Sequence, residues 1–195
     1  MSLADPVTGR CARVGVDGAV PTDTSTVADA VAAAVAASGR PVARVSAADF
    51  LRPRSVRLEH GVEDPDAGYE RWVDHQGLRR EALDPMGPGG ALTWLPTLWD
   101  AAADRATRAV PVRAVPGTVL VVDGPFLLRW ETADAFDLTV HLDVSPPALA
   151  RRLPTADLGR VTGAWERYAS ETWPADRADV VVRYDRPAHP AVAVR

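Results

Sequence analysis

The chain has 195 residues, a length typical of one domain and sufficient to bury a core without disulfides or a structural metal. Hydrophobic residues make up 47%, charged residues 25%, and the formal net charge is −4. This composition excludes a disordered chain and argues against a general nucleic-acid binder. The single cysteine, Cys11, excludes an intramolecular disulfide and suits a reducing cytosol.

No apolar stretch approaches the roughly 18 residues that span a bilayer. The chain also opens without a signal-peptide pattern, so we predict a cytoplasmic protein with neither membrane nor nucleic acid as a partner. All 22 basic residues are arginine. No side-chain ammonium is therefore available for chemistry anywhere in the sequence.

The opening predicts a strand, a helix and a second strand. Residues 12–18 form a short apolar run that ends in glycine, and residues 41–46 form another. Residues 27–38 between them are mostly alanine and valine, with valines recurring every fourth position, which favours a helix. Gly39 lies where a helix C-cap glycine belongs. This order is typical of a βαβ unit with a parallel sheet.

The following stretch is rich in Arg, Asp, Glu, Gly and Pro. Within it, residues 68–83 predict one helix and residues 84–90 a loop. A short helix is predicted later, at residues 147–153. Three further apolar runs predict strands at residues 118–124, 138–144 and 180–184.

The turn after the first strand is similar to a phosphate-binding loop, G-x-x-x-x-G-K-[ST], whose backbone N–H groups surround phosphates. Gly18 matches the first glycine, and Ser25 matches the hydroxyl that binds magnesium, with Thr26 beside it. However, Asp23 replaces the second glycine and Thr24 replaces the lysine.

These replacements would weaken a phosphate site. Pro21 removes a backbone donor, and the carboxylate of Asp23 would repel a polyphosphate. Alternatively, Thr22, Asp23 or Thr24 simply caps the helix that follows.

Asp123 closes the strand at residues 118–124 after a run of apolar residues. In an α/β sheet, a carboxylate at that edge is suited to a metal site, although it could also be a polar strand terminus.

Further motifs follow in one order along most of the chain, at residues 13–18, 45–50, 52–54, 78–80, 83–90, 119–128, 137–140, 142–144, 167–168 and 178–182. With them, the sequence resembles the uridine kinase and phosphoribulokinase-like family of P-loop kinases in its short bacterial form. The resemblance implies a Rossmann-like P-loop NTPase fold, a three-layer α/β sandwich whose mainly parallel central sheet is flanked by helices. It also implies ATP and Mg²⁺ as cofactors, and a nucleoside-like or other small hydroxyl compound as acceptor.

The resemblance further implies one P-loop kinase-like domain over residues 1–195, with an acceptor-side insertion at about 51–116 and a shortened lid at about 151–165. Ser25 and Asp123 fall on metal-binding positions, and Asp49 on a position that handles the acceptor. The nucleotide positions are Gly18, Ala19, Thr22, Asp23, Thr24, Ser25 and Thr26, with Arg151, Arg152 and Arg160 in the lid. The acceptor positions are Asp49, Phe50, Arg52, Arg57, Tyr69 and Trp99.

Three functional positions differ from the family pattern, because Ala48 also replaces the aspartate expected to receive the acceptor proton. By analogy with oxyanion donors, loss of the lysine costs roughly a hundred- to thousandfold in rate. Two hypotheses follow. The first is a weak phosphotransferase in which Asp49 acts as the base and lid arginines replace the lysine. The second is a non-catalytic degenerate kinase that binds a small ligand or a protein partner.

The remaining polar and aromatic residues have simpler interpretations. Three histidines are predicted to be solvated surface residues: His60, His75 and His189. His141, within a strand, is expected to be packed or hydrogen-bonded. Trp94 and Trp99 could stack on an acceptor, although packing is the favoured role. The arginine pairs at 79–80 and 151–152 are most simply solvated helix faces.

Overall fold

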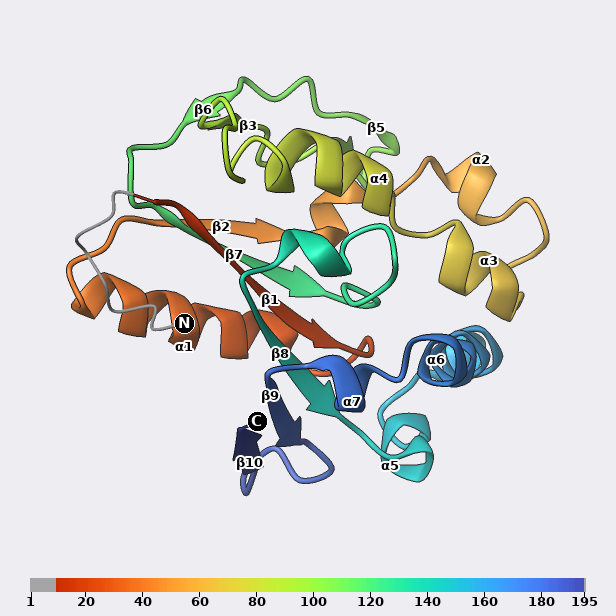
Figure 1. The fold of residues 1–195 in the computed structure, drawn as a ribbon. Helices are drawn as coiled ribbons and strands as arrows, with labels where there is room; N and C mark the ends of the chain where they lie inside the picture. The colour runs from red at the N-terminus through yellow and green to blue at the C-terminus, as the bar shows by residue number, and fades with distance from the viewer. Residues whose placement is uncertain (1–9, 195) are drawn as a thin grey trace.

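The computed structural model describes residues 10–194, which form a central six-stranded sheet in the order β10-β9-β8-β1-β7-β2 (Figure 1). All neighbouring strands pair in parallel except β10 and β9. The mainly parallel sheet predicted from the sequence is confirmed. The strands are β1 (Ala12–Gly18), β2 (Val42–Ser46), β7 (Val119–Gly124), β8 (Leu138–Asp143), β9 (Val180–Arg183) and β10 (Ala191–Val194).

The central strands β1 and β7 are buried over their whole lengths because both faces of the sheet are covered. Val119 and Val121 of β7 pack toward α1 (Thr24–Ala37), which covers one face. Leu120 and Val122 pack on the opposite face, beneath α4 (His75–Leu78). Figure 1 shows α1 and α4 on opposite sides of the sheet, so the fold has the predicted three layers.

The parallel register brings the carboxyl ends of β1, β2 and β7 to one edge of the sheet. Val16 pairs with Asp123, Ser46 also pairs with Asp123, and Gly18 pairs with Leu142 of β8. The polar residues that follow these strands therefore meet at a single edge.

The prediction of one helix at residues 68–83 is wrong. The segment contains the end of α3 (Pro65–Glu70), then α4, then a π-helical turn, η3 (Arg79–Leu83). Between α3 and α4 the chain forms a bridge from Val73 to Leu51, and the Asp74 carboxylate caps α4 by accepting from the N–H of Gly77. Tertiary pairing with the segment after β2 therefore interrupts the helical periodicity.

Most other elements agree with the predictions to within a few residues. α1 begins at Thr24, before the predicted start, and Gly39 has the positive φ of a helix-ending glycine. The helix predicted at 147–153 is α5 (Pro146–Ala150). Short elements complete the connections: η2 (Ala47–Phe50), α2 (Arg54–Arg57), β3 (Thr93–Trp94), β4 (Trp99–Asp100), β5 (Arg105–Ala106), β6 (Val112–Arg113), η4 (Ala133–Ala135), η5 (Thr155–Asp157) and α7 (Pro174–Arg177).

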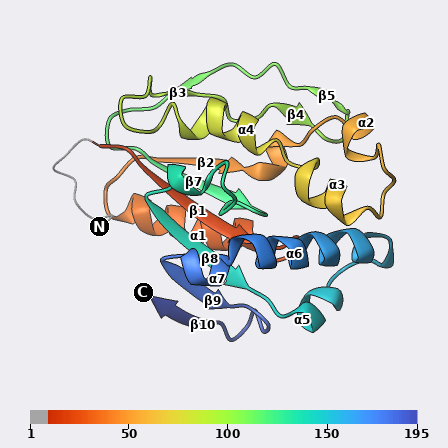
Figure 2. The same cartoon turned by 45° about the vertical axis from the view of Figure 1, so that its right-hand side comes forward.

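The long helix α6 (Leu158–Thr172) was not predicted as an element. The predicted lid segment, residues 151–165, ends inside it. α6 is amphipathic, and the apolar members of its buried face are Val161, Ala164, Trp165 and Tyr168. Figure 2 shows α6 running alongside α3. No helix within residues 10–194 is long and apolar enough to cross a membrane.

Candidate functional site

The loop between β1 and α1 uses its backbone donors internally. The N–H of Thr22 donates to the carbonyl of Ala19 at 2.6 Å, and its hydroxyl donates to the same oxygen at 2.5 Å. The N–H of Thr24 donates to the carbonyl of Thr22 at 2.7 Å. Pro21 has no N–H to offer. A phosphate-binding loop requires such N–H groups to point at the ligand, so this loop lacks much of the donor set.

Asp23 places a carboxylate at the start of α1. Its side chain makes no capping hydrogen bond, and instead accepts from the hydroxyl of Tyr184 at 3.4 Å. Partial burial and the charge of Asp23 both raise the pKa of Tyr184. Arg152 donates to the carbonyl of Tyr184 at 2.6 Å and lies over its ring. Arg152 therefore stabilises the segment that follows β9. Asp23 places a negative charge where a phosphate would have to bind, and the two would repel each other.

Asp123, at the end of β7, is buried and engaged through both carboxylate oxygens. Oδ1 accepts from Nη2 of Arg44 at 2.9 Å. Oδ2 lies 3.3 Å from the hydroxyl of Thr24 and 3.5 Å from that of Ser46. Nε of Arg44 also pairs with Asp29 of α1 at 2.9 Å. The guanidinium is therefore fixed between two carboxylates.

This arrangement does not fit the Mg²⁺ and ATP that the resemblance implies. Mg²⁺ needs oxygen ligands in near-octahedral geometry, and Asp123 is already neutralised by the Arg44 guanidinium. The structure brings Thr24, rather than Ser25, to Asp123. Ser25 and Thr26 are exposed.

Asp49 lies in η2, after β2, beside the exposed Ala48. Partial burial raises the pKa of Asp49, and the negative charge of Asp123 raises it further. A carboxyl with a raised pKa is better matched to accepting a proton near neutral pH than an ordinary aspartate.

A pocket of about 240 Å³ opens beside this edge of the sheet. We call it the apolar pocket. Its aromatic walls are Trp72, Phe126 and Trp165, and Ala48 and Arg160 also line it. The lining is almost entirely apolar.

Beneath the apolar pocket lies a buried polar network centred on Asp17 of β1. Oδ2 of Asp17 accepts from Nδ1 of His141 at 2.7 Å and from the hydroxyl of Tyr168 at 2.9 Å, while Oδ1 accepts from the N–H of Leu127 at 2.9 Å. The His141 ring stacks on Trp165 with centroids 5.8 Å apart. The network therefore joins β1, β8 and α6 directly behind a pocket wall.

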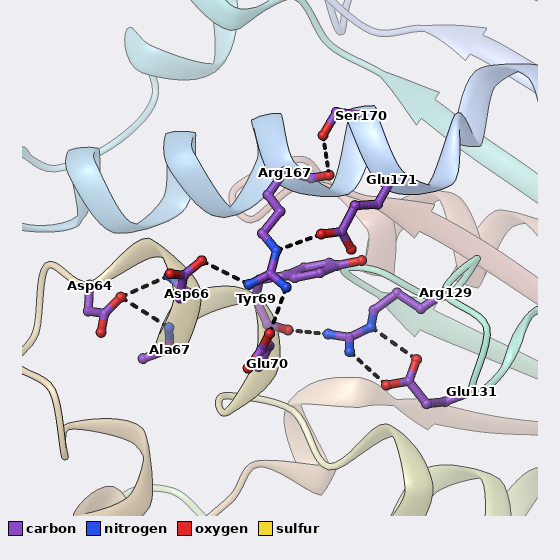
Figure 3. A network of polar contacts seen from close by, with 10 residues as sticks. All are labelled: Asp64, Asp66, Ala67, Tyr69, Glu70, Arg129, Glu131, Arg167, Ser170 and Glu171. Carbon is purple, nitrogen blue, oxygen red and sulfur yellow. Dashed lines mark hydrogen bonds and ion pairs between the residues drawn. The ribbon is translucent and has the colours of Figure 1, made fainter.

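A second network holds α3 against α6, as Figure 3 shows. The Arg167 guanidinium pairs with Asp66 at 2.8 Å, with Glu70 at 2.7 Å and with Glu171 at 2.7 Å, and it lies over the Tyr69 ring. Because α3 and α6 both contribute to the apolar pocket, this network fixes the distance between two of its walls.

Figure 3 also shows Arg129 on the other side of this region, paired with Glu131 and donating to the carbonyl of Tyr69. The Arg129 guanidinium lies 4.1 Å from the centroid of the Tyr69 ring. Tyr69 thus contacts the guanidinium groups of Arg129 and Arg167, and these contacts hold α3 in place.

None of the five aromatic or basic residues predicted for the acceptor lines the apolar pocket. Phe50 and Tyr69 are in the core. Nε of Arg57 donates to the carbonyl of Arg52 at 2.8 Å, and the indole of Trp99 donates to Asp104 at 3.1 Å. Both contacts lie within the segment predicted as an insertion, residues 51–116. Trp94 is likewise buried, as the packing interpretation predicts.

His75 corrects a prediction, because it is buried and not a solvated surface residue. Burial, and then the positive charge of Arg129, lower the pKa of His75 to about 4. Its Nε2 lies 3.2 Å from the carbonyl of Pro125. Arg79 also differs from the expected solvated face, since it binds Asp134 and the carbonyl of Glu131.

Sequence reasoning missed Trp72, Trp165 and the network of Asp17 as parts of the site. A usable signal for Asp17 was a carboxylate inside an otherwise apolar strand, which requires buried partners. No comparable signal marked the tryptophans, because their positions depend on how α3 and α6 pack. Among residues 10–194, no three His, Cys, Asp or Glu side chains gather in a metal-binding cluster.

The strand order, the loop between β1 and α1, and the carboxylate that ends the neighbouring strand β7 define a P-loop type of α/β fold. No protein-family model matches the chain, and no curated protein matches its sequence.

Solved structures do match. A structure described as a possible uridine kinase from Bacillus stearothermophilus has a TM-score of 0.74 at 23% identity, covering 92% of this chain and 91% of that one. One described as a fructose transport system kinase of Silicibacter sp. TM1040 has a TM-score of 0.66 at 20% identity, covering 87% and 95%. The YGR205w protein has a TM-score of 0.60 at 8% identity, covering 95% and 91%. The chain therefore has the fold of uridine kinase-like P-loop kinases, as the sequence resemblance implies.

Proposed function

We propose that the protein is a degenerate member of the P-loop kinase fold that binds a small molecule at the carboxyl edge of its sheet. It transfers phosphate from Mg-ATP weakly or not at all. The observation that carries this proposal is the ion pair between Arg44 and Asp123. A protein cation lies on the carboxylate that would otherwise contribute to a metal site.

The loop chemistry supports the same conclusion. Phosphoryl transfer depends on positive charge and preorganised donors around the transferring group. In this chain Thr24 occupies the lysine position, and its hydroxyl donates to the carboxylate of Asp123. The N–H groups of Thr22 and Thr24 donate to carbonyl oxygens within the loop. The carboxylate of Asp23 opposes the approach of a polyphosphate. Several independent contributions to nucleotide binding are thus lost together.

A second candidate is a slow uridine kinase-like phosphotransferase that acts on a small hydroxyl or nucleoside-like acceptor. The raised pKa of Asp49 favours it. Asp49 also follows Ala48, which lines the apolar pocket. In this version Asp49 accepts the proton of the attacking hydroxyl.

Calorimetric titration with Mg-ATP separates the two candidates. We expect no saturable heat at millimolar Mg-ATP and no ADP release with uridine or other small hydroxyl compounds. Saturable heat, together with acceptor-dependent ADP release that is lost in Asp49→Asn, would establish the second candidate and refute the first.

Variants test the reason for the loss. Asp23→Gly with Thr24→Lys should restore part of the affinity for Mg-ATP, and adding Arg44→Ala should increase it further by freeing Asp123. The matched control is Arg183→Ala, which removes an exposed arginine paired with Asp143 away from the loop. If the triple variant binds no better than the natural chain, the ion pair is not what prevents nucleotide binding.

A further inference from the structure

The apolar pocket is unlike a site for a polyhydroxylated ligand. Its walls are the rings of Trp72, Phe126 and Trp165, and Arg160 supplies the charge among its lining side chains. Several hydroxyl groups placed against these rings would lose more hydrogen bonds to water than the few polar groups of the lining could replace, which costs free energy. Flat apolar rings would instead gain by burial and by stacking on the aromatic walls.

The size of the pocket sets the size of the ligand. An engineered apolar cavity of about 150 Å³ in another protein holds benzene. The apolar pocket is larger, about 240 Å³, so a ligand of one or two fused rings fills it. The methyl group of Ala48 stands at this pocket, where the family pattern has a carboxylate, so the ligand meets no negative charge from that position.

Arg160 gives the pocket a positive wall. Arg160 is buried, with 8% of the residue exposed, and its guanidinium carbon lies 3.5 Å from the centroid of the Trp72 ring. The guanidinium of Arg57 lies 5.1 Å from the same ring. Nη2 of Arg160 pairs with Asp157, but its Nε has no hydrogen-bond partner among the residues that the structure describes. An arginine in this position favours a planar anion, which it can bind by directed hydrogen bonds.

We propose that the apolar pocket binds a planar aromatic carboxylate of one or two rings, in preference to a ribonucleoside. The rings lie against Trp72, Phe126 and Trp165, and the carboxylate is directed toward Arg160. The inference rests on the proposed function, in which this pocket takes a small molecule without phosphate transfer.

The network behind the pocket supports a rigid aromatic site. Trp165 is stacked on His141, which is held by the carboxylate of Asp17, and the network of Arg167 fixes α3 against α6. A preformed wall loses little conformational entropy when a flat ligand binds.

Calorimetry and thermal-shift measurements with three probes test the proposal: indole-3-acetate, its neutral amide indole-3-acetamide, and uridine. We expect saturable heat and a raised melting temperature with the carboxylate, affinity for the amide at least about tenfold weaker, and no response to uridine. Arg160→Met should abolish the difference between carboxylate and amide.

Filling the pocket provides the second test. Ala48→Phe should abolish binding of the carboxylate, because Ala48 is exposed and lines the pocket. The matched control, Ala33→Phe, places the same ring on the exposed face of α1 and should leave binding unchanged.

The binding results that would overturn this inference differ from the ADP-release result that would refute the proposed function. No heat from either indole compound, uridine binding as tight as the carboxylate, or full binding by Ala48→Phe would overturn the inference. Equal affinity for carboxylate and amide would also overturn it. None of these results involves ATP, whereas acceptor-dependent ADP release would refute the proposed function itself.

Discussion

Replacing Asp17 by asparagine tests how far the buried network stabilises the fold. The carboxylate accepts three hydrogen bonds, from His141, Tyr168 and the backbone of Leu127. Asparagine has nearly the same shape, but one of its two terminal groups is a donor. At least one group that now donates to the carboxylate must therefore lose its hydrogen bond, change its proton arrangement or face another donor in a fully buried site.

The expected loss of stability follows from these contacts. A hydrogen bond to a charged group contributes about 1.5–3 kcal/mol, and removing one partner from a buried charged network costs about 3–5 kcal/mol. We expect Asp17→Asn to lower the free energy of unfolding by about 3 kcal/mol, or the melting temperature by roughly 6–12 °C for a chain of this size.

Urea unfolding followed by circular dichroism measures this loss, and a double-mutant cycle with Tyr168→Phe measures the coupling. The two losses should not add, because both variants remove the same hydrogen bond. Arg80→Gln, which removes an exposed pair with Glu81, is the control and should cost less than about 1 kcal/mol. If Asp17→Asn costs no more than this control, or if the two losses add fully, the network does not stabilise the fold as argued.

Three further predictions concern stability. His75 has its pKa lowered from 6.5 to about 4, so its stabilising contribution, roughly 3 kcal/mol, is present above pH 6.5 and is lost as the pH falls through about 4. Between pH 6.5 and 4, urea unfolding should show a smaller loss of unfolding free energy in His75→Gln than in the natural chain. If the free energy of unfolding of the two proteins depends on pH in the same way, the burial argument is wrong. Arg167→Met should lower the melting temperature measurably, because several partners lose their cation, and salt should reduce the difference between variant and parent. Gly124→Ala should lower the melting temperature more than Gly117→Ala. Both glycines have a positive φ, so both substitutions strain the backbone. A Cβ on Gly124 would also lie 2.4 Å from the Cβ of Ala47, whereas a Cβ on Gly117 would meet nothing within 4 Å. Equal losses would show that backbone strain alone sets the cost.

Sequence patterns predicted the sheet well because buried parallel strands leave a local signal. The apolar run that ends in Asp123 is such a case, since both faces of β7 are covered. The helical segments were harder. The span 68–83 has helical periodicity, but its pairing with the segment after β2 interrupts it, and that contact is invisible in a local window.

The candidate site was predictable only in part for the same reason. Gly18 and Asp123 lie at strand ends and Asp23 directly precedes α1, so their positions could be predicted from the order of strands and turns. The pairing of Arg44 with Asp123 depends on the register of β2 against β7, which places Arg44 opposite Val121 and Ser46 opposite Asp123. In the sequence alone, nothing distinguishes Arg44 from an ordinary exposed strand residue.

The register also explains how the carboxylate of Asp123 is stabilised by residues of the chain itself. A buried carboxylate such as that of Asp123 is costly unless a cation or donors satisfy it. In a kinase the metal ion and nucleotide can supply that positive charge. Arg44 and the Thr24 hydroxyl supply it here from within the chain, so Asp123 is satisfied without any ligand. Under the proposed function, the same contacts that satisfy Asp123 weaken the electrostatic attraction for Mg-ATP, and the small molecule binds in the apolar pocket instead.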